Sequence, residues 1–496
     1  MRLRTAFLLT LLPPFLAPAA GPAPDIASIL DQARKAPGEF AADSLIRLAS
    51  LDSLDKPKRI ALLEEAFGRA GEAKQALKRR VAITRVAGPA RFLARAYNQD
   101  LDALSLRLRV IEALLPLDAR KARELALKIP PPQVPKTACG EFQTYDVDRL
   151  YAVLGEVSRQ TYTAKEAERG EPLRLLRPQV AALTAPEQAG PAALMLAAVT
   201  IDDRAFATLV SDFQQALRNM VGDDRSFTAA EAAIGQQIET LVHACQRRSI
   251  STLPLLEAYR LFLVNHLAGA RCADDELQRP LMEGTVAALA GGFVDPQAPQ
   301  VVQFFNERLQ VSPLQPLTET EVTPSHVAGR AVGLEGCQDA GCKAAAGLYA
   351  VLFTDDKGAV LSIAERRTPE WQAALRQFLE AVSHGWKDGT GQAGVNTFVE
   401  KCEYYSRALE LAPLAADKEL VAHAWLDYLE QPGEVRGQPA VWFFSIRQMM
   451  ARAQLDTAGM QKAAEDLKQS KDPVIALYLA LESVAPQSPA ELILLL

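Results

Sequence analysis

The sequence predicts an all-α protein, an irregular α-solenoid of stacked helical hairpins arranged in two lobes. Three observations favour this fold class. Apolar residues make up 49% of the 496 residues but aromatic residues only 6%, and Ala and Leu supply most of the apolar content. Apolar side chains return at helical spacing along most of the chain, and short connections rich in Pro, Gly or Asp separate the segments. Such a composition favours helices that pack closely through small side chains.

Two segments near the amino terminus show the helical pattern clearly. Residues 56–71 carry one apolar stripe that ends at Gly71, a natural helix stop. Residues 100–115 carry two stripes on different faces: Leu101, Leu104, Leu108, Ile111 and Leu115 on the first, and Leu106, Val110 and Leu114 on the second. A helix with two apolar stripes is contacted from two sides, which is typical of an inner layer of stacked helical pairs.

Similar amphipathic segments recur along the rest of the chain. Between residues 142 and 290 they cover 142–160, 172–183, 191–200, 202–220, 228–247, 254–269 and 279–290. Nearer the carboxyl terminus they cover 393–411, 416–430, 438–453, 457–469 and 473–484. Another helix begins at Thr368, because an N-cap hydroxyl precedes Pro369 at the first helical position and Glu370 in the first turn. No repeated signature links these segments, so the predicted array is irregular.

Strands are scarce in this sequence. We expect at most one short strand pair, near 347–364, where residues 359–363 follow the turn-like segment 355–358. The preceding residues 343–353 are ambiguous between strand and helix, and their alanines favour helix.

Two breaks divide the chain. Residues 129–135 contain consecutive prolines and predict an extended segment that crosses the outside of the array. Residues 311–336 combine prolines with Thr, Ser, Glu and Gly, and the composition changes after them: all four tryptophans lie downstream. We therefore place an amino-terminal helical lobe at 20–310, a linker at 311–336 and an aromatic-rich helical lobe at 337–496. The apolar end, residues 491–496, is expected to pack on the second lobe, with a partner-docking tail as the alternative.

The first nineteen residues resemble a secretory signal peptide in their composition. Arg2 and Arg4 form a basic region, residues 6–16 form an apolar core, and Ala17 to Ala19 offer small residues for cleavage. The sequence therefore predicts an exported protein, periplasmic or extracellular. After this segment the longest apolar run, 192–201, is about half of what a membrane span needs. We expect the mature chain to be soluble, with no transmembrane segment.

Charge argues against a nucleic-acid partner. The chain has 54 basic and 60 acidic residues, for a net charge of −6, and both signs are mixed along its length. A nucleic-acid-binding protein needs a basic excess or a basic stripe, because neutralising phosphates dominates its affinity. Short arginine clusters such as 79–80 and 247–248 are typical of solvated helix faces.

Six cysteines permit disulfides in an exported protein but are too sparse for a disulfide-held scaffold. The most plausible local pair is Cys337 with Cys342, where Gly341 allows the chain to turn. A structural zinc site is the competing interpretation, but no second ligand pair lies at a suitable spacing.

The sequence contains no catalytic motif that stands above chance. It lacks the His-Glu-x-x-His pattern of zinc proteases, the Gly-x-Ser-x-Gly nucleophile turn and the glycine-rich phosphate loops. Glu239, His243 and His266 fall on neighbouring predicted helices, but helix-face pairs of this kind are common. We therefore predict no catalytic residue, no cofactor and no metal site, and the balance favours a protein that is not an enzyme.

Aromatic residues of the second lobe can be interpreted either as a ligand groove or as part of the core. They could line a ligand groove, because aromatic faces stack on sugar rings: Trp386, Tyr404, Tyr405, Trp425 and Trp442. Their helical spacing favours core packing instead.

Three functional hypotheses follow from the sequence, and one of them is a structural protein whose partner is its own copy. The leading one is a non-enzymatic exported protein whose extended helical surface binds an unknown protein partner, in a scaffold or interaction role in the cell envelope. The alternative is a glycan-binding or polysaccharide-lyase-like protein that uses the aromatic groove of the second lobe.

Overall fold

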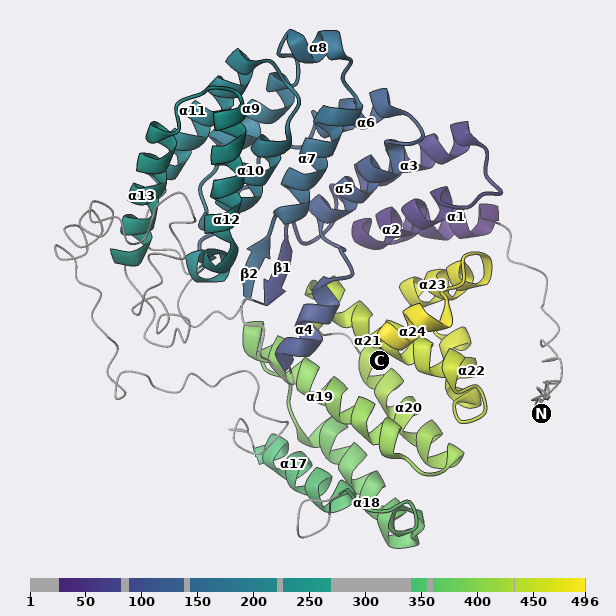
Figure 1. Ribbon diagram of the computed structural model, residues 1–496. Helices are drawn as coiled ribbons and strands as arrows, with labels where there is room; N and C mark the ends of the chain where they lie inside the picture. Colours follow the sequence, from purple (N-terminus) through teal and green to yellow (C-terminus); the bar gives the residue numbers. More distant parts are fainter. Residues whose placement is uncertain are drawn as a thin grey trace, which may run out of the picture.

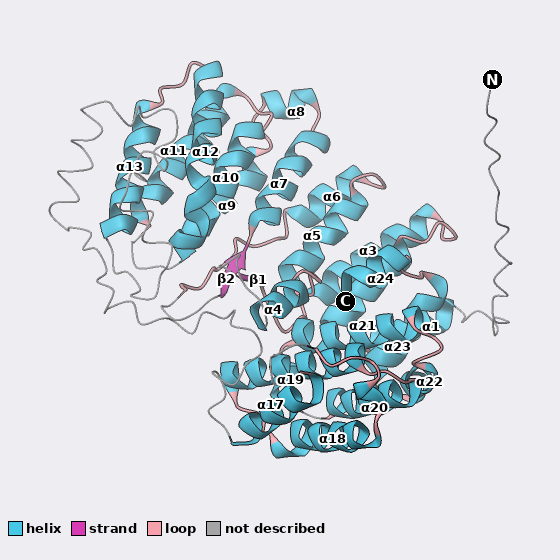
Figure 2. Cartoon of the chain, turned by 60° about the horizontal axis from the view of Figure 1, so that its bottom comes forward, coloured by secondary structure: helices cyan, strands magenta, loops and turns pink. Residues whose placement is uncertain are grey.

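The computed structural model describes residues 26–81, 89–137, 143–220, 226–268, 340–354, 360–431 and 433–495. Within this part of the chain the fold is all-α, with one short antiparallel strand pair (Figures 1 and 2). The predicted fold class is therefore confirmed. The predicted helix at 279–290 and the predicted linker at 311–336 lie outside the described residues, so the lobe boundary stays a prediction.

The amino-terminal half contains helices α1 to α13 and the two strands. The helices are α1 (Ile26–Lys35), α2 (Gly38–Ala49), α3 (Lys56–Ala70), α4 (Pro89–Tyr97), α5 (Ala103–Leu114), α6 (Ala119–Ala126), α7 (Asp148–Gln160), α8 (Ala164–Glu168), α9 (Leu173–Ala181), α10 (Pro186–Ala198), α11 (Asp203–Asn219), α12 (Ser226–Arg247) and α13 (Leu253–Ala268). The strands are β1 (Lys78–Val81) and β2 (Gln143–Asp146).

The carboxyl-terminal half contains α17 to α24. The helices are α17 (Ala340–Phe353), α18 (Pro369–Glu380), α19 (Gly391–Leu411), α20 (Ala415–Glu430), α21 (Pro439–Leu455), α22 (Gln461–Gln469), α23 (Pro473–Val484) and α24 (Pro489–Leu495). Two short 3-10 turns, η2 (Glu365–Arg367) and η4 (Glu434–Gly437), join them, and a π turn, η3 (Ala381–Gly385), continues α18. Among the described helices none is long and apolar enough to cross a membrane.

Local sequence signals set several helix ends as predicted. Helix α3 begins after Asp55, whose carboxylate accepts a hydrogen bond from the backbone N–H of Lys58 at 2.8 Å, and it ends at Ala70, just before its C-cap Gly71. Helix α18 begins after Thr368, whose hydroxyl accepts from the backbone N–H of Trp371. Each cap satisfies a backbone N–H that the first helical turn leaves without a partner.

The strand pair does not lie where the sequence predicted it. Residues 340–353 form helix α17, and near 347–364 the described residues make only an isolated bridge between Thr354 and Val360. The sheet instead pairs β1 with β2, with Lys78 opposite Asp146 and Val81 opposite Gln143. Ion pairs support it, because Lys78 contacts Asp146 and, at 2.9 Å, Asp100.

Helices of the amino-terminal half pack on neighbours a few steps away in the chain. Helix α5 packs on α3 and α7, α7 packs on α10, and α10 packs on α12. A second row lies alongside the first: α9 packs on α11, and α11 packs on α13 (Figure 1). The stripes predicted at 100–115 explain the inner position of α5, since Leu106 and Val110 of one stripe and Leu108 and Ile111 of the other are all buried.

The two halves of the chain share one hydrophobic core. Helix α4 leaves the amino-terminal row and packs on α19 and α21, while α1 and α2 pack against α23 (Figure 1). Aromatic rings fill both contacts. Phe92 of α4 meets Phe444 of α21 edge to face at 4.9 Å, and Phe40 of α2 meets Tyr478 of α23 edge to face at 6.1 Å.

The apolar end of the chain packs on the carboxyl-terminal half, as predicted. Helix α24 lies against α21, and the side-chain amide of Gln448 donates to the backbone carbonyl of Leu495 at 2.9 Å. Leu492 and Leu495 are buried, whereas Ile493 faces outward.

Candidate functional site

The five aromatic residues considered as a ligand groove are buried. Each exposes between 0% and 4% of its surface: Trp386, Tyr404, Tyr405, Trp425 and Trp442. Tyr405 stacks on Trp425 with ring centroids 6.3 Å apart, whereas Trp442 packs on Phe40 of α2. Their helical spacing turns these rings toward neighbouring helices, so they fill the core. None of the five presents an open face on which a sugar ring could stack.

The cysteines of the described residues are buried. Cys342 is disulfide-bonded. Its predicted partner Cys337 lies outside the described residues, so the pairing stays a prediction. Cys245 and Cys402 are free thiols, and burial raises the pKa of Cys245 to about 11 and that of Cys402 to about 12. Because the thiolate is the reactive form, neither thiol is suited to nucleophilic chemistry.

A charged network is buried where α2, α5 and α23 meet. The carboxylate of Asp43 accepts from Arg109 at 2.7 Å and from the Tyr478 hydroxyl at 2.6 Å, and it lies 3.2 Å from Arg47. Burial acts to raise the pKa of Asp43, but the two guanidinium groups and the Tyr478 hydroxyl outweigh it and hold the pKa well below its usual range. Arg47 also lies 3.5 Å from Glu482 of α23. The network joins the two ends of the chain, and its carboxylate is fully occupied.

A second buried charge belongs to Lys401 of α19. Its ammonium group donates to the Trp386 carbonyl at 2.6 Å and to Asp388 at 2.7 Å, and it lies 5.0 Å from the centre of the Tyr428 ring. A carboxylate, a carbonyl and an aromatic face together stabilise a buried ammonium group. These contacts occupy the amine, so we assign it a structural role.

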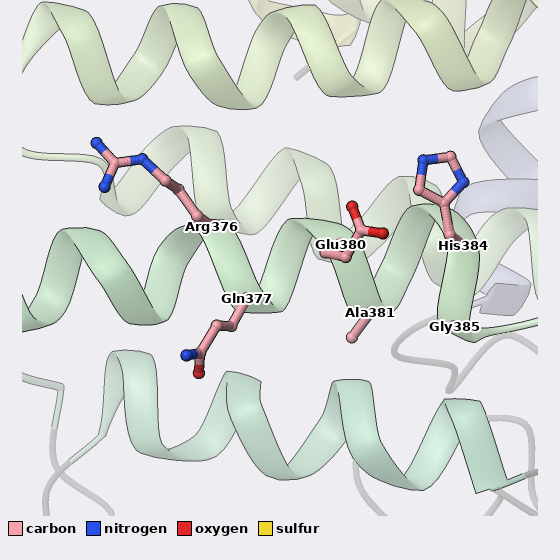
Figure 3. A pocket seen from close by; sticks show the side chains of 6 residues that line it. All are labelled: Arg376, Gln377, Glu380, Ala381, His384 and Gly385. Atoms are coloured by element: carbon pink, nitrogen blue, oxygen red, sulfur yellow. The ribbon is translucent and has the colours of Figure 1, made fainter.

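A shallow pocket of about 640 Å³ follows α18 and the π turn η3. Figure 3 shows Arg376, Glu380 and His384 projecting from one side of this helix and Gln377 and Ala381 from the other. A side chain at position 341 would collide with the carbonyl of Gly385, so α17 approaches the π turn closely. All the described lining residues belong to α18 and its continuation, so only one wall of this pocket is defined.

A hollow larger than this pocket, a groove of about 1060 Å³, lies between α6 and α9. We call it the α6–α9 groove. Both helices pack on α7 (Figure 1), which holds them on either side of the space. It is lined by Arg120, Arg123, Glu124, Leu127, Tyr162, Gly170, Glu171, Leu173, Arg174, Arg177, Pro178 and Ala181.

The α6–α9 groove is apolar between two charged margins. One margin is a face of α6, where Arg120 and Arg123 lie a turn apart and the exposed Leu127 follows one turn later. The other margin is a face of α9 with Arg174 and Arg177. The apolar lining comes from Leu127, Tyr162, Leu173, Pro178 and Ala181.

One ion pair and one aromatic ring hold Arg123 in the groove. Arg123 lies 2.9 Å from Glu166, and its guanidinium group covers the Tyr162 ring at 4.6 Å. Hydrogen bonds from the Thr163 backbone, together with Arg123 and the Thr163 hydroxyl, lower the pKa of Glu166 to about 2. Glu166 therefore stays ionised at neutral pH and fixes the position of Arg123.

The remaining arginines of the α6–α9 groove are more exposed. Arg120 pairs with Glu124 at 3.3 Å and Arg177 with Asp212 at 2.8 Å, and their side chains are 83% and 55% exposed. Arg174 is also exposed and makes no ion pair within the described part of the chain. These guanidinium groups are free to meet a ligand, because exposed ion pairs contribute only about 0–1 kcal/mol and can be exchanged.

Sequence reasoning missed this groove because its two margins lie about fifty residues apart in the chain. The sequence signal for the margins is Arg spaced at helical intervals with Leu or Ala, on 120–127 and on 174–181. This pattern does not differ from that of an ordinary solvated helix face. The histidines considered for metal binding take other roles: His266 is buried against the Phe262 carbonyl. No group of three or more potential metal ligands occurs among the described residues.

Comparison of the chain with protein-family models, with curated proteins and with solved structures finds no significant match.

Proposed function

We propose that this chain is an exported, non-enzymatic protein that binds another protein through the α6–α9 groove. The observation that carries the proposal is an apolar strip between two arginine-bearing helix faces. Apolar side chains exposed inside a polar rim are typical of interaction sites. Leu127 is 40% exposed in this setting.

The groove is preformed, and this supports its use as a binding site. Its margins α6 and α9 both rest on α7, and Tyr162 is held beneath Arg123. A partner that enters such a site need not order the helices that contact it, so less binding free energy is lost to conformational entropy. Arginine and tyrosine are also enriched among the residues that dominate protein interfaces.

Export is the part of the proposal that rests on sequence alone. The basic residues Arg2 and Arg4, the apolar core 6–16 and the small residues 17–19 support it. Determination of the amino terminus of the protein recovered from the cell envelope tests it. A chain that begins after residue 19 supports export, and a chain recovered only from the cytosol with residues 1–19 attached contradicts it.

Site-specific crosslinking tests the binding site. A photoreactive residue is placed at position 127 in the groove or at position 455 on α21, since Leu127 and Leu455 are 40% and 41% exposed. In the native host we expect one specific crosslinked partner from position 127, lost when Arg174→Glu and Arg177→Glu are added, and none from position 455. Equal crosslinking from both positions, or capture that survives the two charge reversals, contradicts the proposal.

A further inference from the structure

We propose that the α6–α9 groove recognises an amphipathic helix of the partner that carries carboxylates on both sides of an apolar stripe. This inference rests on the proposed function and names the chemistry of its partner. It follows from the shape of the groove, from the charge of its margins and from the state of its ion pairs.

The shape of the groove favours a helix over an extended strand. Its margins are faces of α6 and α9, whose backbone N–H and C=O groups are largely used within the helices. A strand would find no sheet edge here with which to pair. A helix placed between two helix faces buries one apolar stripe, and a contact of about two to two and a half turns matches the eight and nine residues of α6 and α9.

The charge of the margins favours carboxylates on the partner. Four arginines and two glutamates line the groove, and each margin carries two of the arginines: Arg120 and Arg123 on α6, and Arg174 and Arg177 on α9. A bound helix therefore has guanidinium groups on both flanks. Glu or Asp on either side of the apolar stripe would meet them, and the planar guanidinium group binds a carboxylate with two hydrogen bonds.

The existing ion pairs leave room for this exchange. Glu124 is held by Lys121 at 3.1 Å as well as by Arg120, so it keeps a partner when Arg120 turns to a ligand. Arg174 has no ion pair to give up within the described residues. Glu171 does not favour a partner carboxylate, because it would repel one that lies near the α8–α9 turn. The acidic residues of the partner should therefore avoid that end of the groove.

The test uses the full-length chain and designed peptides of about 18 residues. The first peptide is a helix with a leucine stripe flanked by glutamates. The second replaces the glutamates with lysines, and the third keeps the glutamates but has a central proline. Fluorescence anisotropy at about 50 and about 500 mM salt measures their affinities, because exposed charge pairs are screened by salt.

We expect saturable binding of the glutamate helix only, weakened by salt and at least about tenfold by the proline. Arg174→Glu with Arg177→Glu should weaken it about tenfold. Arg174→Glu alone and Arg376→Glu on α18 form the matched pair, since each reverses one exposed arginine, the first in the groove and the second in the other pocket. Far-UV circular dichroism confirms that each variant is folded.

Two results would overturn the inference: lysine and glutamate peptides that bind equally well, or binding that responds to Arg376→Glu and not to the groove variants. Crosslinking at position 127 separates this failure from that of the proposed function. A partner captured there through a segment that is neither helical nor acidic leaves the function intact and rejects only the inference. Without specific capture at position 127, both fail.

Discussion

The α6–α9 groove and the aromatic cluster of the carboxyl-terminal half show how differently surface and core use similar side chains. Tyr162 in the groove is partly exposed beneath Arg123, whereas Tyr405 and Trp425 stack on each other with no exposure. The aromatic-rich region is conspicuous in the sequence as a candidate binding site, yet its rings are buried between packed helices. The groove is built mainly from arginines and aliphatic residues, which look ordinary in sequence. Richness in aromatic residues therefore marks where these helices meet, and exposure marks where a ligand can bind.

The largest expected difference between the two regions is in stability. Trp425→Ala removes a fully buried ring of α20 and should lower the free energy of unfolding by about 3–5 kcal/mol. Leu127→Ala in the groove removes an exposed side chain and should change it by less than about 0.5 kcal/mol. Urea denaturation followed by circular dichroism measures both. Comparable losses would mean that Leu127 belongs to the core, and the contrast between the regions would fail.

Asp43→Ala tests the buried network that joins the two halves. The change leaves Arg47 and Arg109 without their carboxylate, so we expect a loss of about 3–5 kcal/mol in the free energy of unfolding. Asp31→Ala is the control, because its pair with Lys35 is exposed and should contribute about 0–1 kcal/mol. Similar effects of the two substitutions would show that the Asp43 network does not hold the halves together.

The same network predicts sensitivity to acid. The pKa of Asp43 is lower in the folded chain than in the unfolded chain, where it is about 3.9. Its contribution to stability is therefore complete above about pH 4 and is lost as the pH falls further. Urea denaturation between about pH 2 and about pH 5 should show a steeper loss for the wild type than for Asp43→Ala. Parallel pH profiles would contradict this account.

Asp102 should make stability depend on pH more weakly than Asp43 does, and in the opposite direction. It caps α5 through the backbone N–H of Ser105 at 2.9 Å, and burial raises its pKa to about 6. Because the folded state holds this proton more tightly, stability should fall by about 1–3 kcal/mol as the pH rises from about 4 to about 6. Asp102→Asn keeps a good capping group and should remove this dependence. A pH profile unchanged in the variant would show that Asp102 is not responsible.

The smallest effect is expected at the arginines of the groove. Arg174→Glu alters an exposed side chain with no ion pair in the described residues, so its free energy of unfolding should change by less than about 0.5 kcal/mol. Arg376→Glu should behave in the same way. A larger loss at position 174 would indicate that the margin of the groove stabilises the fold, and binding data from that variant would then need correction for stability.

Local signals predicted the helices well because they act over a few residues. Asp55 and Gly71 bound α3, and Thr368 starts α18, since caps satisfy backbone groups within one turn. The preference for a helix over 343–353 was also correct. These features need no knowledge of distant parts of the chain.

Features that depend on distant residues were missed. Strand β1 pairs with β2 more than sixty residues later, and its sequence Lys-Arg-Arg-Val has no apolar alternation. Nothing local indicates that α4 leaves its neighbours to pack on α19 and α21. The α6–α9 groove likewise arises only when α7 brings two separate helix faces together. Long-range packing therefore decided the sheet, the union of the halves and the candidate site.

Hydrogen–deuterium exchange of the chain, with and without the peptide that carries flanking glutamates, tests the central claim most directly. Binding in the α6–α9 groove predicts slower exchange confined to 119–127 and 162–181, where ligand contact stabilises the margins and the turn between them. Slower exchange confined to 386–428, around the buried aromatic rings, would contradict the claim and return the binding site to the carboxyl-terminal half.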